Sequence, residues 1–138
     1  MALSATEITT IIRQGLPAAT ESAFRVEHVE GARVRCRMPF NEKQLRPGGT
    51  LSGPTMMDLA DAAMYASVLA QHGALEMAVT QNLNINFLRR PAQRDLIAVA
   101  EPLRAGRRSM VLDVRVYSDG DDRLVAHATG TYALPQQP

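Results

Sequence analysis

Residues 48–71 read GGTLSGPTMMDLADAAMYASVLAQ, a glycine-rich segment followed by a run of mostly apolar residues. Pro54 suits the first turn of a helix and Gly73 suits the position after its last turn, so the run predicts a helix over 54–71. Apolar side chains cover nearly the whole circumference of this helix, as in helices that lie inside a protein core. We therefore expect one long helix enclosed by the rest of the chain.

Two carboxylates interrupt this apolar run. Asp58 and Asp61 stand three residues apart, on neighbouring positions of one helix face. A carboxylate in an apolar helix is costly unless it is paired or hydrogen-bonded. A structural explanation is a solvent gap, a subunit boundary or an arginine partner. A functional explanation is a carboxylate that is sheltered in a cleft and acts as a base or nucleophile.

The residues on either side of this helix predict one further helix and six strands. Ser4 and Glu7 have the spacing of a capping box, and apolar residues at helical spacing follow, which predicts a helix over 4–16 that Pro17 ends. Alternating apolar and polar residues predict strands over 22–30, 33–40, 77–88, 95–104, 108–118 and 123–134. A long helix inside a run of strands indicates an α+β fold, in which an antiparallel sheet wraps around the helix.

The composition is that of an ordinary globular protein. Its 138 residues, 46% of them hydrophobic and 21% charged, suffice for a single domain, with an N-terminal helix within 1–18 and a tail over 135–138. A net charge of +1 argues against nucleic-acid binding. One cysteine, Cys36, and three scattered histidines argue against disulfides and a structural metal. We find no signal peptide and no run of about 20 apolar residues, so we expect a cytoplasmic protein without membrane contact.

The loop before the long helix has the chemistry of an oxyanion site. Gly48, Gly49 and Gly53 allow another group to approach the backbone closely. The free N–H groups at a helix start favour negative charge, including the oxyanion that forms during acyl transfer. Such a site, about two helical turns from a buried carboxylate, suits attack on a thioester or ester.

Several segments, taken in order, resemble the hotdog-fold thioesterases of the phenylacetate-degradation (PaaI-like) group. The first is the segment from Gly49 to Pro54 followed by Leu-Ala-Asp61. The others are TQNLNINFLRRP over 80–91, Gly-Arg-Arg over 106–108 and LVAHATGTY over 124–132. The resemblance implies a long helix wrapped by a curved antiparallel sheet of about six strands. It also implies homodimers whose sheets join, often paired into tetramers, with active sites at the subunit interface.

The resemblance further implies an acyl-coenzyme A thioesterase that needs no metal or redox cofactor, with coenzyme A as part of the substrate. By position, Asp61 is the general base or the nucleophile, and the Gly53 N–H polarises the thioester carbonyl. Thr80, contributed across the dimer, positions the attacking water or the carboxylate.

Three positions depart from the family pattern: Ser52 replaces a histidine, Pro54 replaces a glycine and Arg46 replaces a polar asparagine. Ser52 caps the helix or donates to substrate, and Arg46 holds a substrate carboxylate or phosphate. Asp58 is open to two interpretations. It shares a pocket and a proton with Asp61, or it pairs with an arginine such as Arg46, which is the interpretation we favour.

The remaining candidates concern the substrate. Arg89, Arg90 and Arg108 are the arginines that we expect to bind the phosphates of coenzyme A. Met57 and Tyr65 are expected to set the depth of the acyl pocket. The main alternative function is a hotdog module that binds or senses acyl-coenzyme A without cleaving it, because the family histidine is missing at position 52.

Overall fold

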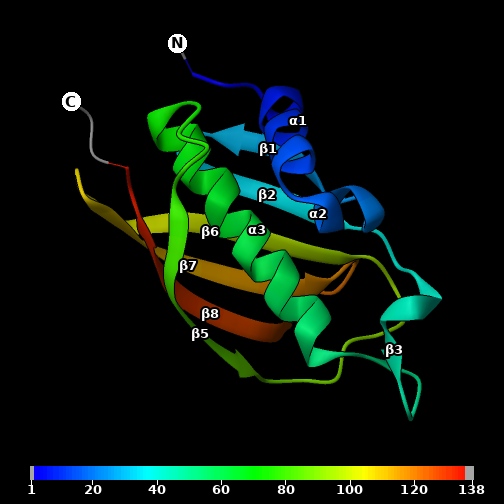
Figure 1. Cartoon of the computed structure of the whole chain (residues 1–138). Helices are drawn as coiled ribbons and strands as arrows, with labels where there is room; N and C mark the ends of the chain where they lie inside the picture. Colours follow the sequence, from blue (N-terminus) through cyan, green and yellow to red (C-terminus); the bar gives the residue numbers. More distant parts are fainter. Residues whose placement is uncertain (1, 136–138) are drawn as a thin grey trace.

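The computed structural model describes residues 2–135 and confirms the α+β prediction (Figure 1). A 20-residue helix, α3 (Gly53–His72), crosses a six-stranded antiparallel sheet with the strand order β1-β2-β6-β7-β8-β5. The strands are β1 (Arg25–Glu30), β2 (Arg33–Met38), β5 (Val79–Phe87), β6 (Leu96–Ala105), β7 (Ser109–Ser118) and β8 (Leu124–Ala133). Each predicted strand therefore has a counterpart. Of the predicted tail over 135–138, residues 136–138 lie outside the described residues.

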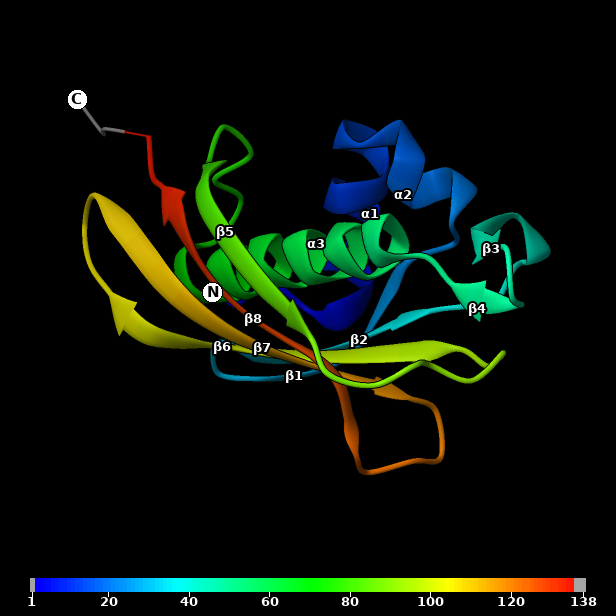
Figure 2. The ribbon, with the colours of Figure 1, turned by 90° about the horizontal axis from the view of Figure 1, so that it is seen from below.

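Helix α3 is buried along most of its length, as its composition predicts. The side chains from Leu59 to Leu69 are buried except for Asp61, which is partly exposed. Ser52 caps the start of the helix, and Gly73, with φ 85°, ends it. Figure 2 shows α3 lying lengthwise on one face of the sheet, with α1 (Ala5–Gly15) and α2 (Pro17–Glu21) on the same side.

The N-terminal segment differs from the prediction at Pro17. The capping box of α1 is present, since Ser4 Oγ accepts from the Glu7 N–H and Glu7 accepts from the Ser4 N–H. Pro17 does follow the end of α1, but it also begins the short helix α2, where its fixed φ suits the first helical position. Between β2 and α3 the chain forms a 3-10 turn (Glu42–Gln44) and a small hairpin of β3 (Leu45–Arg46) and β4 (Thr50–Leu51).

Strand β5 is an edge strand with an irregularity near its start. Thr80 lies opposite Tyr132 of β8, whereas the next paired residue, Asn82, lies opposite Thr131. Gln81 is therefore an extra residue, a β-bulge that reverses the alternation of side chains. Simple alternation would place Thr80 on the same face as Asn82. With the bulge, Thr80 instead faces the helix beside the buried Tyr132.

Gly130 lets the sheet approach α3 closely. A Cβ atom at Gly130 would lie 2.7 Å from the backbone oxygen of Asn82 and 2.7 Å from the sulfur of Met64 on α3.

Neighbouring backbone cannot move aside as a flexible side chain can, so Gly130→Ala is expected to destabilise the fold by about 1–3 kcal/mol. Urea denaturation checks this. Gly15→Ala is the control, because no atom lies within 4 Å of a Cβ there. Equal stability of the two variants would contradict the argument.

Candidate active site

Two hydroxyl groups hold the side chain of Asp61. Thr80 donates through Oγ1 to Asp61 Oδ1 at 2.6 Å, and Tyr132 donates through its hydroxyl to the same oxygen at 2.8 Å. Within residues 2–135 no arginine, lysine or histidine pairs with this carboxylate. Hydrogen bonds from neutral groups, rather than an ion pair, therefore hold the Asp61 side chain in place.

The Thr80 contact is formed within one chain. The resemblance implied that Thr80 reaches Asp61 from a partner subunit, and the structure corrects this. The bulge at Gln81 turns the Thr80 side chain toward α3 of its own chain, where it meets Asp61. No second subunit is needed to bring these two side chains together.

A cavity of about 510 Å³ opens beside Asp61, Thr80 and Tyr132. Tyr65 forms part of its wall and stacks on Tyr132, with ring centroids 6.0 Å apart and an interplanar angle of 9°. The Tyr65 hydroxyl donates to the backbone oxygen of Glu76 at 3.0 Å. Burial and the nearby charge of Glu76 raise the pKa of Tyr65. Most of the remaining wall is apolar and comes from Ile11, Leu16, Met77, Ala78 and Val79.

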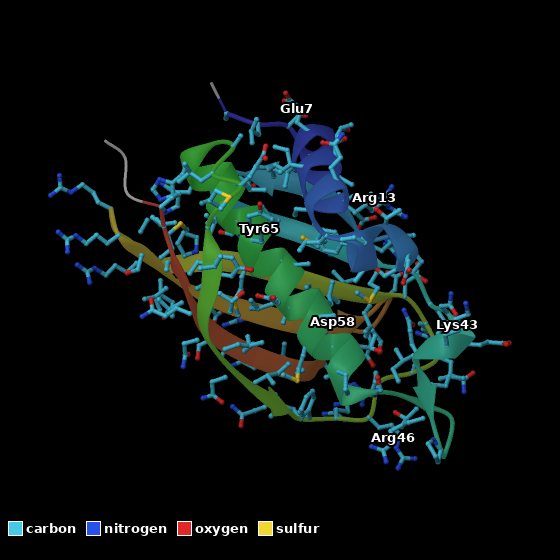
Figure 3. The ribbon with its side chains drawn as sticks, in the orientation of Figure 1. Glu7, Arg13, Lys43, Arg46, Asp58 and Tyr65 are labelled. Atoms are coloured by element: carbon cyan, nitrogen blue, oxygen red, sulfur yellow. The ribbon has the colours of Figure 1, made fainter. Side chains whose placement is uncertain are left out.

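Asp58 lies beside Asp61 rather than beside Arg46. Both aspartates line a cavity of about 200 Å³ between α2 and α3. Figure 3 shows Arg46 on the small hairpin, well away from Asp58. No salt bridge joins Asp58 to Arg46 among the described residues, so the favoured interpretation of Asp58 is wrong. Burial, and then the charge of Asp61, raise the pKa of Asp58.

A third cavity, of about 540 Å³, lies at the start of α3. Gly53, Arg46, Arg89 and Arg90 all line it, together with apolar residues that include Phe87. Its position combines the positive end of a helix with three arginines, which makes it suited to anionic groups. The structure thus brings together four of the residues that the sequence singled out.

The first turn of α3 has one N–H group free for a ligand. Pro54 has no N–H, and the Thr55 N–H donates to Ser52 Oγ at 3.3 Å. Ser52 Oγ also lies 2.8 Å from the hydroxyl oxygen of Thr55, so its hydroxyl is engaged in capping the helix. Among the described residues the Gly53 N–H has no acceptor. Gly53 is therefore the donor that this terminus offers to an oxyanion.

Two further candidates lie apart from this cavity. Arg108 belongs to the turn between β6 and β7, and Figure 1 shows that turn at the opposite end of the sheet from the start of α3. One chain therefore does not group Arg108 with Arg89 and Arg90. Met57 is 38% exposed on α3 and lines neither large cavity.

Gly53 and Asp61 do not share a cavity. Eight residues separate them, which is about 12 Å along an α-helix. Gly53 faces the cavity at the start of α3, and Asp61 faces the cavities beside Tyr65 and beside Asp58. Within one chain the two groups cannot contact the same carbonyl group.

The sequence of the central part of the chain matches a known protein family. Residues 48–125, more than half of the chain, match the family model described as the thioesterase superfamily. The chain belongs to the thioesterase superfamily. The matched span contains Gly53, Asp61 and Thr80.

Curated relatives of this superfamily member carry provisional esterase names. One from Saccharolobus solfataricus is 30% identical over 138 residues, covering 96% of this chain and 86% of its own length. Another from Bacillus subtilis is 30% identical over 116 residues, covering 81% of this chain and 90% of its own length. These names support hydrolase activity in general.

Solved structures confirm the predicted hotdog fold. A provisionally named thioesterase from a Silicibacter species has 35% sequence identity and a TM-score of 0.87, covering 97% of this chain and 93% of its own. A thioesterase from Haemophilus influenzae also reaches a TM-score of 0.87, at 16% identity and with 99% of this chain covered, and shows the fold alone.

The described part of the chain holds no group of three or more His, Cys, Asp or Glu side chains arranged to bind a metal ion. Among its helices, none combines the length and apolar character needed to cross a bilayer.

Asp58 should carry a stability penalty that depends on pH. Its folded-state pKa is raised from 3.8, so the penalty is absent well below that value and develops as the pH rises through the folded-state pKa. Asp58→Asn should therefore raise the melting temperature at pH 7 relative to wild type, but not at pH 3. Thermal unfolding at both pH values checks this.

Asp121→Asn is the control, because the pKa of Asp121 is lowered whereas that of Asp58 is raised. Hydrogen bonds from Arg123 lower the pKa of Asp121 to about 2, so its ionised form favours the folded state at neutral pH. This variant should not gain stability at pH 7. A melting temperature of Asp58→Asn at or below that of wild type at pH 7 would contradict the penalty.

Proposed function

We propose that this chain is an acyl-coenzyme A thioesterase of the phenylacetate-degradation type, which releases a free acid and coenzyme A. The observation that carries the proposal is the Asp61 carboxylate, fixed by Thr80 and Tyr132 beside a cavity and without a cationic partner among the described residues. The two hydroxyl groups engage only Oδ1, and among the described residues no donor reaches Oδ2. An available carboxylate suits proton abstraction or nucleophilic attack.

In the proposed reaction, Asp61 removes a proton from a water molecule as that water attacks the thioester carbonyl carbon. The carbonyl oxygen becomes an oxyanion and accepts a hydrogen bond from a Gly53 N–H. Collapse of the tetrahedral intermediate breaks the C–S bond and releases the thiolate of coenzyme A. In the variant route, Asp61 attacks the carbonyl itself and forms an anhydride that water then hydrolyses. Neither route requires a metal or redox cofactor.

A homodimer would bring Gly53 and Asp61 together. Strand β5 touches Asp61 near its start, through Thr80, and Gly53 near its end, where a Cβ at Gly53 would lie 3.2 Å from the Phe87 ring. The outer edge of β5 pairs with no other described strand, and Val79 and Phe87 are 58% and 49% exposed. Such an edge is a template for strand pairing.

Antiparallel pairing of two β5 edges reverses one strand relative to the other. The Phe87 end of one chain then lies beside the Thr80 end of its partner. Gly53 of one chain can thus serve the same carbonyl as Asp61 of the partner subunit. We propose two such composite sites per dimer, with further pairing of dimers into tetramers as the resemblance suggests.

The cavity at the start of α3 is proposed to receive the phosphates of coenzyme A. Arg46, Arg89 and Arg90 are exposed around it and form no ion pair with a described residue. Guanidinium forks bind phosphate oxygens well. The apolar cavity beside Tyr65 is proposed to receive the acyl group.

Release of free thiol from short-chain, long-chain and aryl acyl-coenzyme A substrates tests the activity. Asp61→Asn keeps the size of the side chain but removes the base, so turnover should fall by about 100-fold or more. Asp113→Asn, on the opposite face of the sheet, is the control and should retain wild-type turnover. Bound but uncleaved acyl-coenzyme A in the wild type would overturn the hydrolase and favour the binding module.

Gly53→Pro tests the oxyanion donor and the composite site together. Proline is tolerated at a first helical position but has no N–H, so kcat should fall by about 100-fold. Gly53→Ala keeps the N–H and adds the same Cβ next to Phe87, and should be far more active.

Refolding Gly53→Pro with Asp61→Asn in equal amounts should restore roughly a quarter of wild-type activity, because half of the dimers then hold one intact site. No recovery on mixing would contradict a site shared by two subunits.

A further inference from the structure

The two oxygens of the Asp61 carboxylate have different surroundings. Oδ1 accepts from the hydroxyls of Thr80, at 2.6 Å, and of Tyr132, at 2.8 Å. Oδ2 accepts no hydrogen bond from any of residues 2–135. Because Asp61 borders two cavities, Oδ2 is the oxygen left for water or substrate.

We infer that Tyr132 is a positioning residue: together with Thr80 it fixes Oδ1 of Asp61 and leaves Oδ2 as the reacting oxygen. This inference rests on the proposed function, in which Asp61 is the base or nucleophile. Tyr132 also lines the cavity proposed for the acyl group, but its hydroxyl is bound to Asp61, so the positioning role acts through the orientation of the Asp61 carboxylate.

The burial of Tyr132 makes it the more rigid of the two donors. The residue is 4% exposed, and its ring stacks on Tyr65. Its hydroxyl lies between Asp61 Oδ1 and the Asp61 backbone oxygen, at 2.8 and 3.1 Å. Thr80, by contrast, is exposed at the sheet edge. Tyr132 therefore ties the carboxylate to the sheet, and Thr80 adds a second donor from the side of the cavity.

Tyr132 also keeps its proton at neutral pH. Burial, and then the negative charge of Asp61, raise the pKa of Tyr132 well above its usual value. The phenol is therefore a permanent donor that does not compete with Asp61 as a base. Its single proton favours Oδ1, because a hydrogen bond to a charged oxygen is stronger than one to a neutral carbonyl.

The bulge in β5 supports a functional origin for this arrangement. Thr80 and Tyr132 are direct cross-strand neighbours, and both side chains face Asp61 only because Gln81 is inserted after Thr80. Bulges frequently re-aim a side chain next to an active site. Two hydroxyls from adjacent strands thus converge on one oxygen atom of the helix.

Loss of the Tyr132 hydroxyl should let the Asp61 carboxylate rotate about its last side-chain bond. Small errors in the position of a reacting group reduce rates strongly, so Tyr132→Phe should lower kcat by roughly 10- to 100-fold. KM should stay within about twofold, because the ring that lines the cavity is kept and the hydroxyl that is lost is bound to Asp61. Tyr117→Phe, on the opposite face of the sheet, is the matched control and should keep wild-type kcat.

A double-mutant cycle separates positioning from a general structural role. In an Asp61→Asn background, Tyr132→Phe should cause no further loss of kcat, because the oxygen that it positions is no longer a base. Thr80→Val should also lower kcat, as Tyr132→Phe does. Thr80→Ser keeps the hydroxyl and should retain most of the wild-type kcat. Melting temperatures show that each variant is folded.

The outcomes distinguish this inference from the proposed function. If wild type is active and depends on Asp61, but Tyr132→Phe keeps wild-type kcat, the positioning role is overturned and the thioesterase stands. Equal losses from Tyr132→Phe in the wild-type and Asp61→Asn backgrounds also overturn it, since they show a role independent of Asp61. Absence of Asp61-dependent turnover in wild type overturns the proposed function and the inference with it.

Discussion

Helix α3 has to be enclosed, because apolar side chains cover nearly all of its surface. The sheet satisfies this requirement from one side, and the N-terminal helix α1, with Ile8 and Ile12 buried, does so from another. The contact is close enough that β8 has only a hydrogen atom as side chain where Met64 meets it, at Gly130. A polar side chain that this helix turns toward the sheet therefore needs a partner from the neighbouring strands.

That requirement accounts for the shape of the candidate site. Asp61 obtains its partners from β5 and β8, through one hydroxyl on each strand. Ser67 solves the same problem elsewhere on the helix by donating to the backbone oxygen of Ala32 at 2.6 Å. The difference is that Ser67 is fully satisfied, whereas Asp61 keeps one oxygen without a donor from the described residues. An unsatisfied oxygen beside a cavity is what a base requires.

Local pattern predicted much of this from sequence. Helical spacing and capping residues gave the bounds of α3 to within one residue, and alternation located all six strands of the large sheet, because both signals depend only on neighbouring residues. The same reasoning missed the bulge at Gln81, since a single inserted residue has no signature in composition. It also paired Asp58 with Arg46 and grouped Arg108 with Arg89, because those questions depend on where loops lie in space.

The residues at the start of α3 leave a single backbone donor there. Ser52 takes up the Thr55 N–H, and Pro54 has no N–H to offer, so the donor capacity of the first turn is concentrated at Gly53. A serine at position 52, unlike a histidine, cannot exchange a proton at neutral pH. In the proposed reaction, proton transfer therefore falls to Asp61 alone. The rate of the proposed reaction then depends on how well the Asp61 carboxylate is oriented. Tyr132, a buried phenol on β8, contributes to the chemistry because it holds that carboxylate.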